Sequence, residues 1–141
     1  MPGKTAKIFV DTDVCLDLLS GRQPFNAHAE KLFSLADTGK IKIYVSSLSF
    51  ANIDYVLRSQ YSTNHSRQII AKFKTLVTVL FVDSKTIDLA IASEFKDFED
   101  AIQYFSAIEN GLTILVTRNT KDFKKATIKI VHPETYLTKA L

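Results

Sequence analysis

Six acidic residues lie at the ends of short apolar stretches or at the starts of helical patterns, where their side chains could converge on one substrate. They are Asp11, Asp13, Asp97, Glu99, Asp100 and Asp122. Carboxylates that crowd together repel one another and need a proton or a compensating cation. Mg²⁺ prefers oxygen ligands and commonly rests on one or two carboxylates plus substrate phosphate. Because such a cation activates water and stabilises charge on an attacked phosphate, the pattern predicts a Mg²⁺ or Mn²⁺ site that hydrolyses phosphodiester bonds.

The hydrophobic pattern predicts the elements that position these acids. Apolar and β-branched runs predict strands at 8–10, 41–45, 77–82, 112–117 and 128–131. Helical periodicity predicts helices at 14–19, 26–38, 50–57, 69–76, 84–91 and 97–108 and from residue 133 onward. Asn26 and Ser84 are suited to cap helices, and Gly39 and Gly111 are suited to end them. This alternation indicates an α/β domain with a mainly parallel sheet and right-handed crossovers.

The chain order also predicts which edge of the sheet carries the chemistry. In parallel α/β sheets, ligands bind beyond the carboxyl ends of the strands. Asp11 follows the first predicted strand, Ser46 the second, and Arg118 and Asn119 a later one. We therefore expect these polar groups to gather at one edge.

Length and composition indicate one ordinary globular domain. The chain has 141 residues, of which 46% are hydrophobic and 23% charged, which is close to average globular usage. This length fits one domain with helices on both faces of a sheet, so we assign residues 1–141 to a single domain. The formal net charge of +3 is compatible with a polyanionic partner such as RNA, but it is a small excess.

Several other classes of protein and site are disfavoured by the sequence. Apolar stretches such as 76–82 and 112–117 are far shorter than the about 20 residues that cross a bilayer. The N-terminal residues leave no room for a signal-peptide hydrophobic region, so we expect a cytoplasmic protein with no membrane partner. Cys15 is the only cysteine; this excludes an internal disulfide and thiolate zinc sites and favours a small core residue.

Three segments, in chain order, resemble the PIN domain family. The first is an apolar strand followed by DTDV at 11–14, the second is DFEDA at 97–101, and the third is VTRNTKDF at 116–123. The likeness spans residues 7–137 and is particularly close to the bacterial single-domain branch that includes VapC-type toxin ribonucleases. It implies a three-layer α/β/α sandwich and a metal-dependent endoribonuclease acting on RNA. Family members often form homodimers and are inhibited by a small antitoxin protein.

The resemblance assigns metal-binding and catalytic roles to three acids. Asp11, at the exit of the first strand, matches the family's first metal-binding acid, and Asp100 matches the third. Asn119 and Asp122 fall in the family's final polar motif, where Asp122 is expected to be the fourth metal-site residue. The implied cofactor is Mg²⁺ or Mn²⁺.

Two positions depart from the family pattern. Asn52 stands where the family usually has its second acid, a Glu, and Asp13 stands where the family commonly has Asn. An amide at position 52 removes one negative charge, which we expect to weaken metal binding and to reduce catalysis. Asp54 points elsewhere on a helix and is a poor substitute. Asp13 would restore charge if its side chain turned inward.

Three further residues are expected to support the site. Asp97 stands three residues before Asp100 and is suited to cap the helix that begins there. Thr117 offers a hydroxyl at a strand end. Arg118 is the best-placed cation for a substrate phosphate, with a surface salt bridge as the alternative.

Two other functions compete with the ribonuclease. The DTDV motif also looks like the nucleophile motif of haloacid-dehalogenase-like phosphatases, in which Asp11 would attack phosphate and Asp13 would act as acid and base. Those enzymes also carry a Gly-Asp motif, and this chain has no Gly-Asp pair. The second alternative is a PIN scaffold that has lost catalysis and binds RNA or a protein partner, which Asn52 favours.

Overall fold

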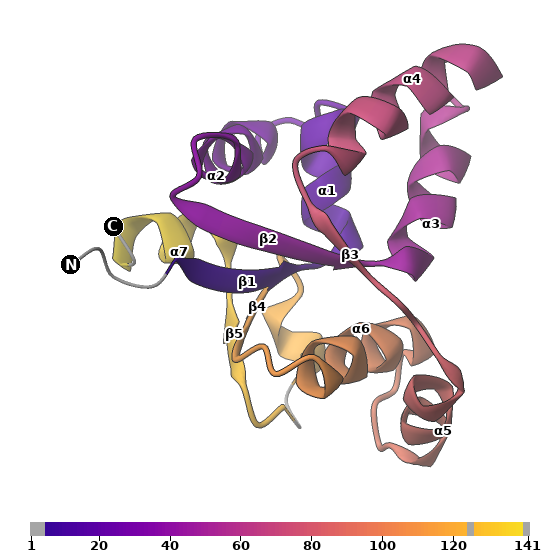
Figure 1. Ribbon diagram of the computed structural model, residues 1–141, viewed down its shortest axis with the longest axis vertical. Coiled ribbons are helices and arrows are strands. Elements are labelled where there is room, and N and C mark those ends of the chain that lie inside the picture. The colour runs from indigo at the N-terminus through magenta and orange to yellow at the C-terminus, as the bar shows by residue number, and fades with distance from the viewer. Residues whose placement is uncertain (1–4, 124–125, 140–141) are drawn as a thin grey trace.

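The computed structural model describes residues 5–123 and 126–139 and shows a parallel sheet between two layers of helices (Figure 1). The strands are β1 (Ala6–Val10), β2 (Ile41–Ser46), β3 (Thr78–Leu80), β4 (Ile114–Val116) and β5 (Lys129–Val131). Every pairing between them is parallel, and their order across the sheet is β3-β2-β1-β4-β5. The predicted three-layer α/β/α sandwich is confirmed.

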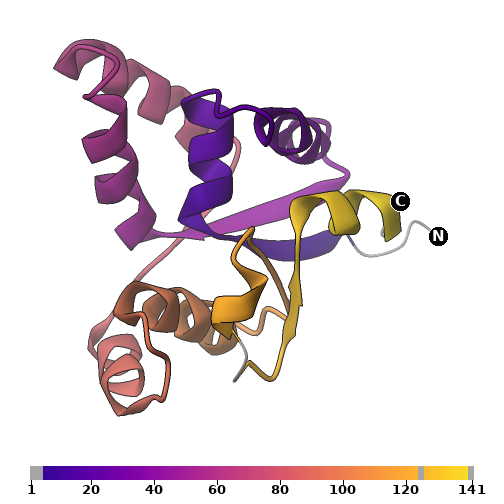
Figure 2. The ribbon, with the colours of Figure 1, turned by 180° about the vertical axis from the view of Figure 1, so that it is seen from behind.

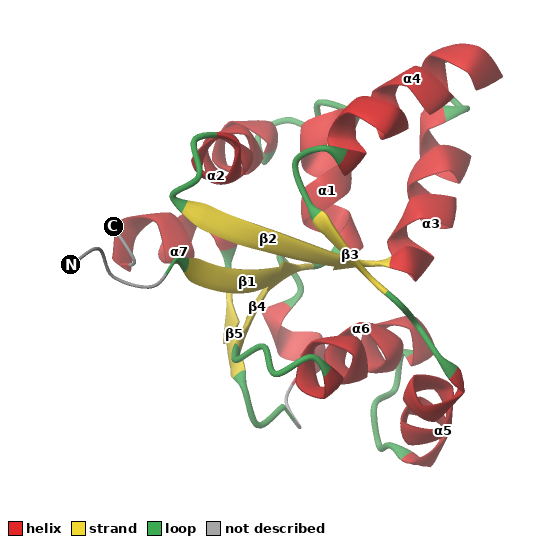
Figure 3. Cartoon of the chain, in the orientation of Figure 1, coloured by secondary structure: helices red, strands yellow, loops and turns green. Residues whose placement is uncertain are grey.

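The helices divide between the two faces of the sheet, as the front and back views show (Figures 1 and 2). One face carries α1 (Thr12–Leu19), α2 (Asn26–Asp37), α3 (Ser47–Leu57), α4 (Thr63–Lys74) and α7 (Pro133–Lys139). The other face carries α5 (Ser84–Ala92), α6 (Phe98–Glu109) and the 3₁₀ turn η1 (Thr120–Phe123). Figure 3 shows the helices in red and the strands in yellow. Within the described ranges, no helix is long and apolar enough to cross a membrane.

Alternation along the strands explains this arrangement. Ile8 and Val10 of β1 point into the apolar cluster beneath α1 and α2, whereas Phe9 points into the cluster beneath α6 with Tyr104 and Leu115. Successive side chains of a strand face opposite sides of the sheet. Because Ile8, Phe9 and Val10 are fully buried, this part of β1 is a continuous apolar run, as expected for a parallel sheet covered on both faces.

Most predicted element ends lie within two residues of the structure, but α3 and α4 begin three and six residues earlier than predicted, and two caps are wrong. Gly39 and Gly111 follow helices with φ of +77° and +70°, the left-handed conformation that ends a helix. Asn26 is the first residue of α2 rather than its cap, and no side chain caps this helix. Asp83, not Ser84, caps α5, because its carboxylate accepts a hydrogen bond from the Thr86 amide at 3.0 Å.

The strand order creates a switch point between β1 and β4. From β1 the chain moves outward to β2 and β3, and it then returns to place β4 and β5 on the other side of β1. Crevices outside the carboxyl ends of strands at such points are the usual ligand sites of open α/β sheets. The register pairs Val10 with Val116, so Asp11 and Thr117 emerge next to each other at this point.

Candidate metal and active site

Asp11 is a buried carboxylate at the switch point. Its side chain is 5% exposed. One oxygen accepts a hydrogen bond from the Thr12 amide at 2.8 Å, which caps α1, and the other accepts from the Thr117 hydroxyl at 2.9 Å. Burial, reinforced by the nearby charges of Asp13 and Asp100, raises the pKa of Asp11 from 3.8 to about 8. Without a cation, Asp11 therefore holds a proton at neutral pH.

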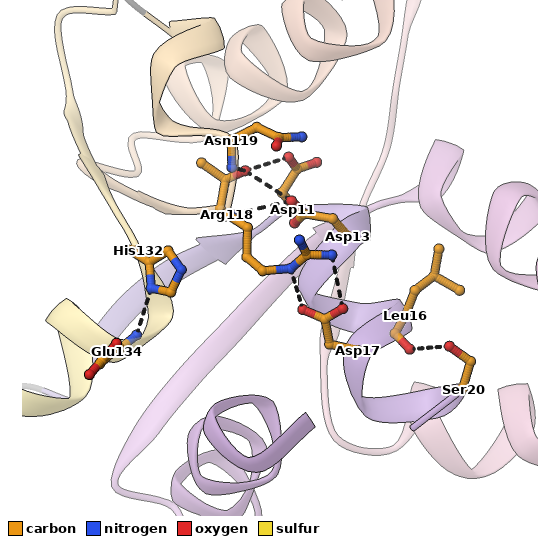
Figure 4. A network of polar contacts seen from close by, with 10 residues as sticks. Asp11, Asp13, Leu16, Asp17, Ser20, Arg118, Asn119, His132 and Glu134 are labelled. Atoms are coloured by element: carbon orange, nitrogen blue, oxygen red, sulfur yellow. Dashed lines mark hydrogen bonds and ion pairs between the residues drawn. The ribbon is translucent and has the colours of Figure 1, made fainter. Parts of the chain in front are cut away.

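Asp13 turns inward beside Asp11 from the first turn of α1 (Figure 4). Its Oδ2 accepts from the Arg118 amide at 3.2 Å and from the Thr117 hydroxyl at 3.5 Å. Its Oδ1 is buried and has no hydrogen-bond partner among the described residues. Burial raises the pKa of Asp13, and the Arg118 charge opposes that rise. An orphaned buried carboxylate oxygen is costly in a folded protein and indicates a missing partner.

Asp100 joins the group from the other helical layer. It lies half-buried in the first turn of α6. Burial raises the pKa of Asp100 to about 7, with further contributions from acids that include Asp97, Asp122 and Asp13. Asp100 lies close enough to Asp11 and to the exposed Asp122 in η1 for their charges to interact. Of the three acids predicted from the sequence, Asp100 therefore lies near both of the others, and their role as metal ligands stays a prediction.

The supporting residues occupy distinct positions around these acids. Thr117 is fully buried; its hydroxyl holds Asp11 and accepts a hydrogen bond from the Asn119 amide at 3.1 Å. Asp97 is the N-cap of α6, where its carboxylate accepts from the Asp100 amide at 2.9 Å. The capping interpretation of Asp97 is confirmed, and this cap fixes the start of the helix that carries Asp100.

Arg118 is paired with a buried acid that the sequence analysis did not single out. Its Nε and one terminal nitrogen donate to the two oxygens of Asp17 at 2.6 and 3.1 Å (Figure 4). Asp17 is 1% exposed, and the guanidinium carbon lies 4.0 Å from the ring centre of Phe25. Asp17 follows Asp13 by one helical turn, and this spacing of two acids is the feature of the sequence that could have pointed to Asp17. The pair turns the guanidinium toward α1, so phosphate binding by Arg118 stays an untested prediction.

A buried polar network lies behind the acids. The Thr12 and Ser49 hydroxyls are 2.7 Å apart, and the Gln103 amide nitrogen donates to both, at 2.9 and 3.1 Å. Ser46, at the end of β2, lies 3.5 Å from Ser49. The network joins α1, α3 and α6, the helices that carry Asp13, Asn52 and Asp100. Gln103 was missed because nothing in its local sequence distinguishes it from an ordinary helical residue.

The arrangement fits a hard divalent cation. Among the described residues, no three His, Cys, Asp or Glu side chains form a ready-made cage. Mg²⁺ does not require one, because it keeps several waters and uses one or two carboxylates. Asp11, Asp13 and Asp100 supply only oxygen ligands. The buried Asp13 Oδ1 has no hydrogen-bond partner among the described residues and is therefore available to bind a cation. The donor chemistry of these side chains suits Mg²⁺ or Mn²⁺, and a cation shared by all three stays a prediction.

A cleft of about 300 Å³, lined in part by Arg22, opens beside Asp13. Its lining includes Thr12, Asp13, Asn52 and Glu99. A larger hollow of about 720 Å³ lies between α2 and α7 and is lined by residues such as His28 and Leu137. That hollow contains none of the acids of the switch point, so size alone does not identify the site.

Comparisons with known proteins agree with this fold. A family model described as "PIN domain" matches residues 7–121. The chain is also 25% identical over 138 residues to "Ribonuclease VapC1" from Aquifex aeolicus (strain VF5), with 92% of each chain covered.

Solved structures with the same fold are also similar over most of the chain. A "Toxin-antitoxin complex from Klebsiella pneumoniae" matches with a TM-score of 0.68 at 22% identity, covering 89% of this chain and 97% of that one. DNA-bound VapBC from Salmonella typhimurium matches with a TM-score of 0.69 at 18% identity, covering 91% and 98%. PAE2754 from Pyrobaculum aerophilum gives 0.65 at 19% identity, covering 95% and 88%. At these identities the likeness establishes the fold.

Proposed function

Because the chain belongs to the PIN domain family, we propose that it is an endoribonuclease that hydrolyses RNA phosphodiester bonds with Mg²⁺ or Mn²⁺. Asp11, Asp100 and Asp122 hold the cation in this proposal, and Asp13 supports them. The name of the Aquifex relative, a ribonuclease matched over most of both chains, supports RNA as the substrate class.

The chain's own residues prepare the site for this reaction. The Thr12 amide and the Thr117 hydroxyl fix the orientation of Asp11. The Arg118 amide does the same for Asp13, and the Asp97 cap positions Asp100. When bound, a divalent cation lowers the pKa of a coordinated water and stabilises negative charge on the attacked phosphate.

One observation carries the proposal. A carboxylate that is 5% exposed lies beside a second carboxylate with an orphaned oxygen, at the carboxyl ends of two adjacent parallel strands. Burying two acids together destabilises a protein unless a proton or a cation compensates them. A dication compensates both at once and provides the chemistry of phosphodiester hydrolysis.

The test is RNA cleavage by purified protein. We expect cleavage of structured RNAs with Mg²⁺ or Mn²⁺ and none with a chelator in excess. Asp11→Asn combined with Asp100→Asn should reduce the rate by at least about 100-fold, because removing one group of a metal or electrostatic site typically costs that much. Asp88→Asn, on the exposed side of α5, is the matched control and should leave the rate unchanged. Undiminished cleavage by the double variant contradicts the proposal.

The partners are proposed from the same comparisons. Two of the matched structures are described as a toxin–antitoxin complex and as DNA-bound VapBC. We propose that this chain acts as the toxin of such a pair and is inhibited by a small antitoxin protein. A short open reading frame beside its gene, whose product co-purifies with the chain, is the expected finding. A homodimer in the cytoplasm remains a prediction from the family resemblance.

A non-catalytic binding module is the second candidate, and Asn52 is the residue that favours it. A pure binding scaffold should show no Mn²⁺-dependent changes in the NMR signals of residues next to Asp11 and Asp100. The phosphatase alternative loses its support, because the family match covers residues 7–121 and the chain lacks a Gly-Asp pair.

A further inference from the structure

Asn52 and Glu99 form a contact between the two helical layers. They lie 47 positions apart, on α3 and α6, and the Asn52 Nδ2 donates to the Glu99 Oε1 at 3.0 Å. A carboxylate only accepts hydrogen bonds, so this contact fixes which end of the Asn52 amide faces Glu99. Asn52 therefore holds an acidic side chain without carrying a charge of its own.

The contact lies in the cleft beside the acids of the switch point. Glu99, Asn52, Thr12 and Asp13 all line this cleft of about 300 Å³. The negative charges of Asp97 and Asp13 both act on the Glu99 carboxylate. Glu99 thus faces the same space as Asp13, whose Oδ1 has no partner in the described part of the chain.

Other acids of this region have a structural use that Glu99 lacks. Asp97 caps α6, and Asp17 is neutralised by Arg118. Glu109, at the other end of α6, lies 3.2 Å from Lys85. Among the described residues no Lys or Arg forms an ion pair with Glu99. Asn52 contributes only a neutral hydrogen-bond donor to this carboxylate.

We propose that Glu99, positioned by Asn52, is a further acid of the divalent-cation site. Glu99 is carried by α6, and its carboxylate lies beside α3 in the cleft, where Asn52 holds it. Asn52 is then a positioning residue, and an amide at position 52 does not by itself leave the site short of charge. This inference rests on the proposed metal site and extends it to a residue that faces solvent.

The test is Mn²⁺ binding measured by calorimetry and by the electron paramagnetic resonance of free Mn²⁺, on the full chain. Glu99→Gln removes the charge and keeps an oxygen that accepts from Asn52. We expect its Mn²⁺ affinity to fall by about 10-fold or more, the usual loss when a partner of a metal site is removed. Asn52→Ala should give a smaller loss, because the carboxylate remains but is no longer held. Glu30→Gln, exposed on α2, is the matched control and should bind Mn²⁺ as the wild type does.

A charge relocation makes the test specific. Asn52→Glu combined with Glu99→Gln places the carboxylate on α3 and the neutral partner on α6, so this double variant should recover affinity lost in Glu99→Gln alone. Both positions lie at least partly exposed, and circular dichroism checks that each variant folds. Unchanged Mn²⁺ affinity in Glu99→Gln overturns the inference, and if Asp11→Asn still abolishes binding, the proposed function survives. Absence of Mn²⁺ binding by the wild type overturns both.

Discussion

At the scale of single residues, Asp11 shows what the sequence could and could not predict. Its place after an apolar strand was sufficient to predict a site residue. Its burial, its bond to Thr117 and its repulsion by Asp13 depend on parts of the chain that meet only in the fold. These surroundings determine its protonation, and so they determine how the metal-free protein responds to pH.

The raised pKa of Asp11 predicts a stability that falls with pH. Between about 4 and about 8 the folded state keeps the Asp11 proton while the unfolded state has lost it, since the pKa rises from 3.8 to about 8 on folding. The free energy of unfolding should therefore decrease through this window, by about 1.4 kcal/mol per pH unit for one full proton. The raised pKa values of Asp13 and Asp100 act in the same direction. Below this window both states are protonated, and above it both are ionised, so the Asp11 contribution to the slope vanishes.

Urea denaturation at a series of pH values, with a chelator present, measures this slope. Asp11→Asn should flatten it and make the metal-free protein more stable at pH 8 than the wild type. A wild-type stability that rises between pH 5 and pH 8 would contradict the predicted protonation of the site.

The pair of Arg118 and Asp17 belongs to the same scale. Arg118→Ala leaves the Asp17 carboxylate, 1% exposed, without its cation, and breaking a buried pair from one side costs about 3–5 kcal/mol. Arg58→Ala is the matched control, because it breaks the exposed pair with Asp54 and should cost at most about 1 kcal/mol. Chemical denaturation of both variants gives the two values. Equal losses would show that the Asp17 pair behaves as a surface contact.

At the scale of elements, the hydrophobic patterns were sufficient to predict the strands and helices, whereas two of the predicted helix caps, Asn26 and Ser84, were wrong. Apolar and β-branched runs located all five strands, because a sheet covered on both faces requires nearly continuous apolar runs. The predicted strand at 112–117 is longer than β4 (Ile114–Val116). Caps depend on which side chain reaches a free amide, and a one-residue shift is enough to move the cap from Ser84 to Asp83. The contact of Asn52 with Glu99 spans 47 positions and leaves no local pattern.

Gln103 is the residue through which three elements meet. Gln103→Ala should lower the free energy of unfolding by about 2–4 kcal/mol, because it removes two buried hydrogen bonds and leaves a cavity. Gln103→Leu fills the volume and also removes the buried Oε1 that has no partner among the described residues, so it should cost less. Urea denaturation compares the two variants. A Leu variant as unstable as the Ala variant would mean that the hydrogen bonds, rather than the packing, hold α6 to α1 and α3.

At the scale of the whole molecule, the strand order determines where the chemistry lies. The sheet runs outward from β1 in both directions, so the carboxyl ends of β1 and β4 form a crevice between the two helical layers. Asp11 and Asp13 reach it from one layer, and Asp100 and Glu99 reach it from the other. Acids from distant parts of the sequence therefore approach one crevice, and the proposed metal site depends on the topology rather than on any one segment.

A crystal soaked in Mn²⁺ tests this account most directly, because Mn²⁺ can be located by its anomalous scattering. The account predicts an anomalous peak beside Asp11, Asp100 and Asp122, close to the Asp13 oxygen that has no hydrogen-bond partner among the described residues. A fully occupied peak elsewhere on the chain, or no peak in a crystal whose acids are free of lattice contacts, would contradict it.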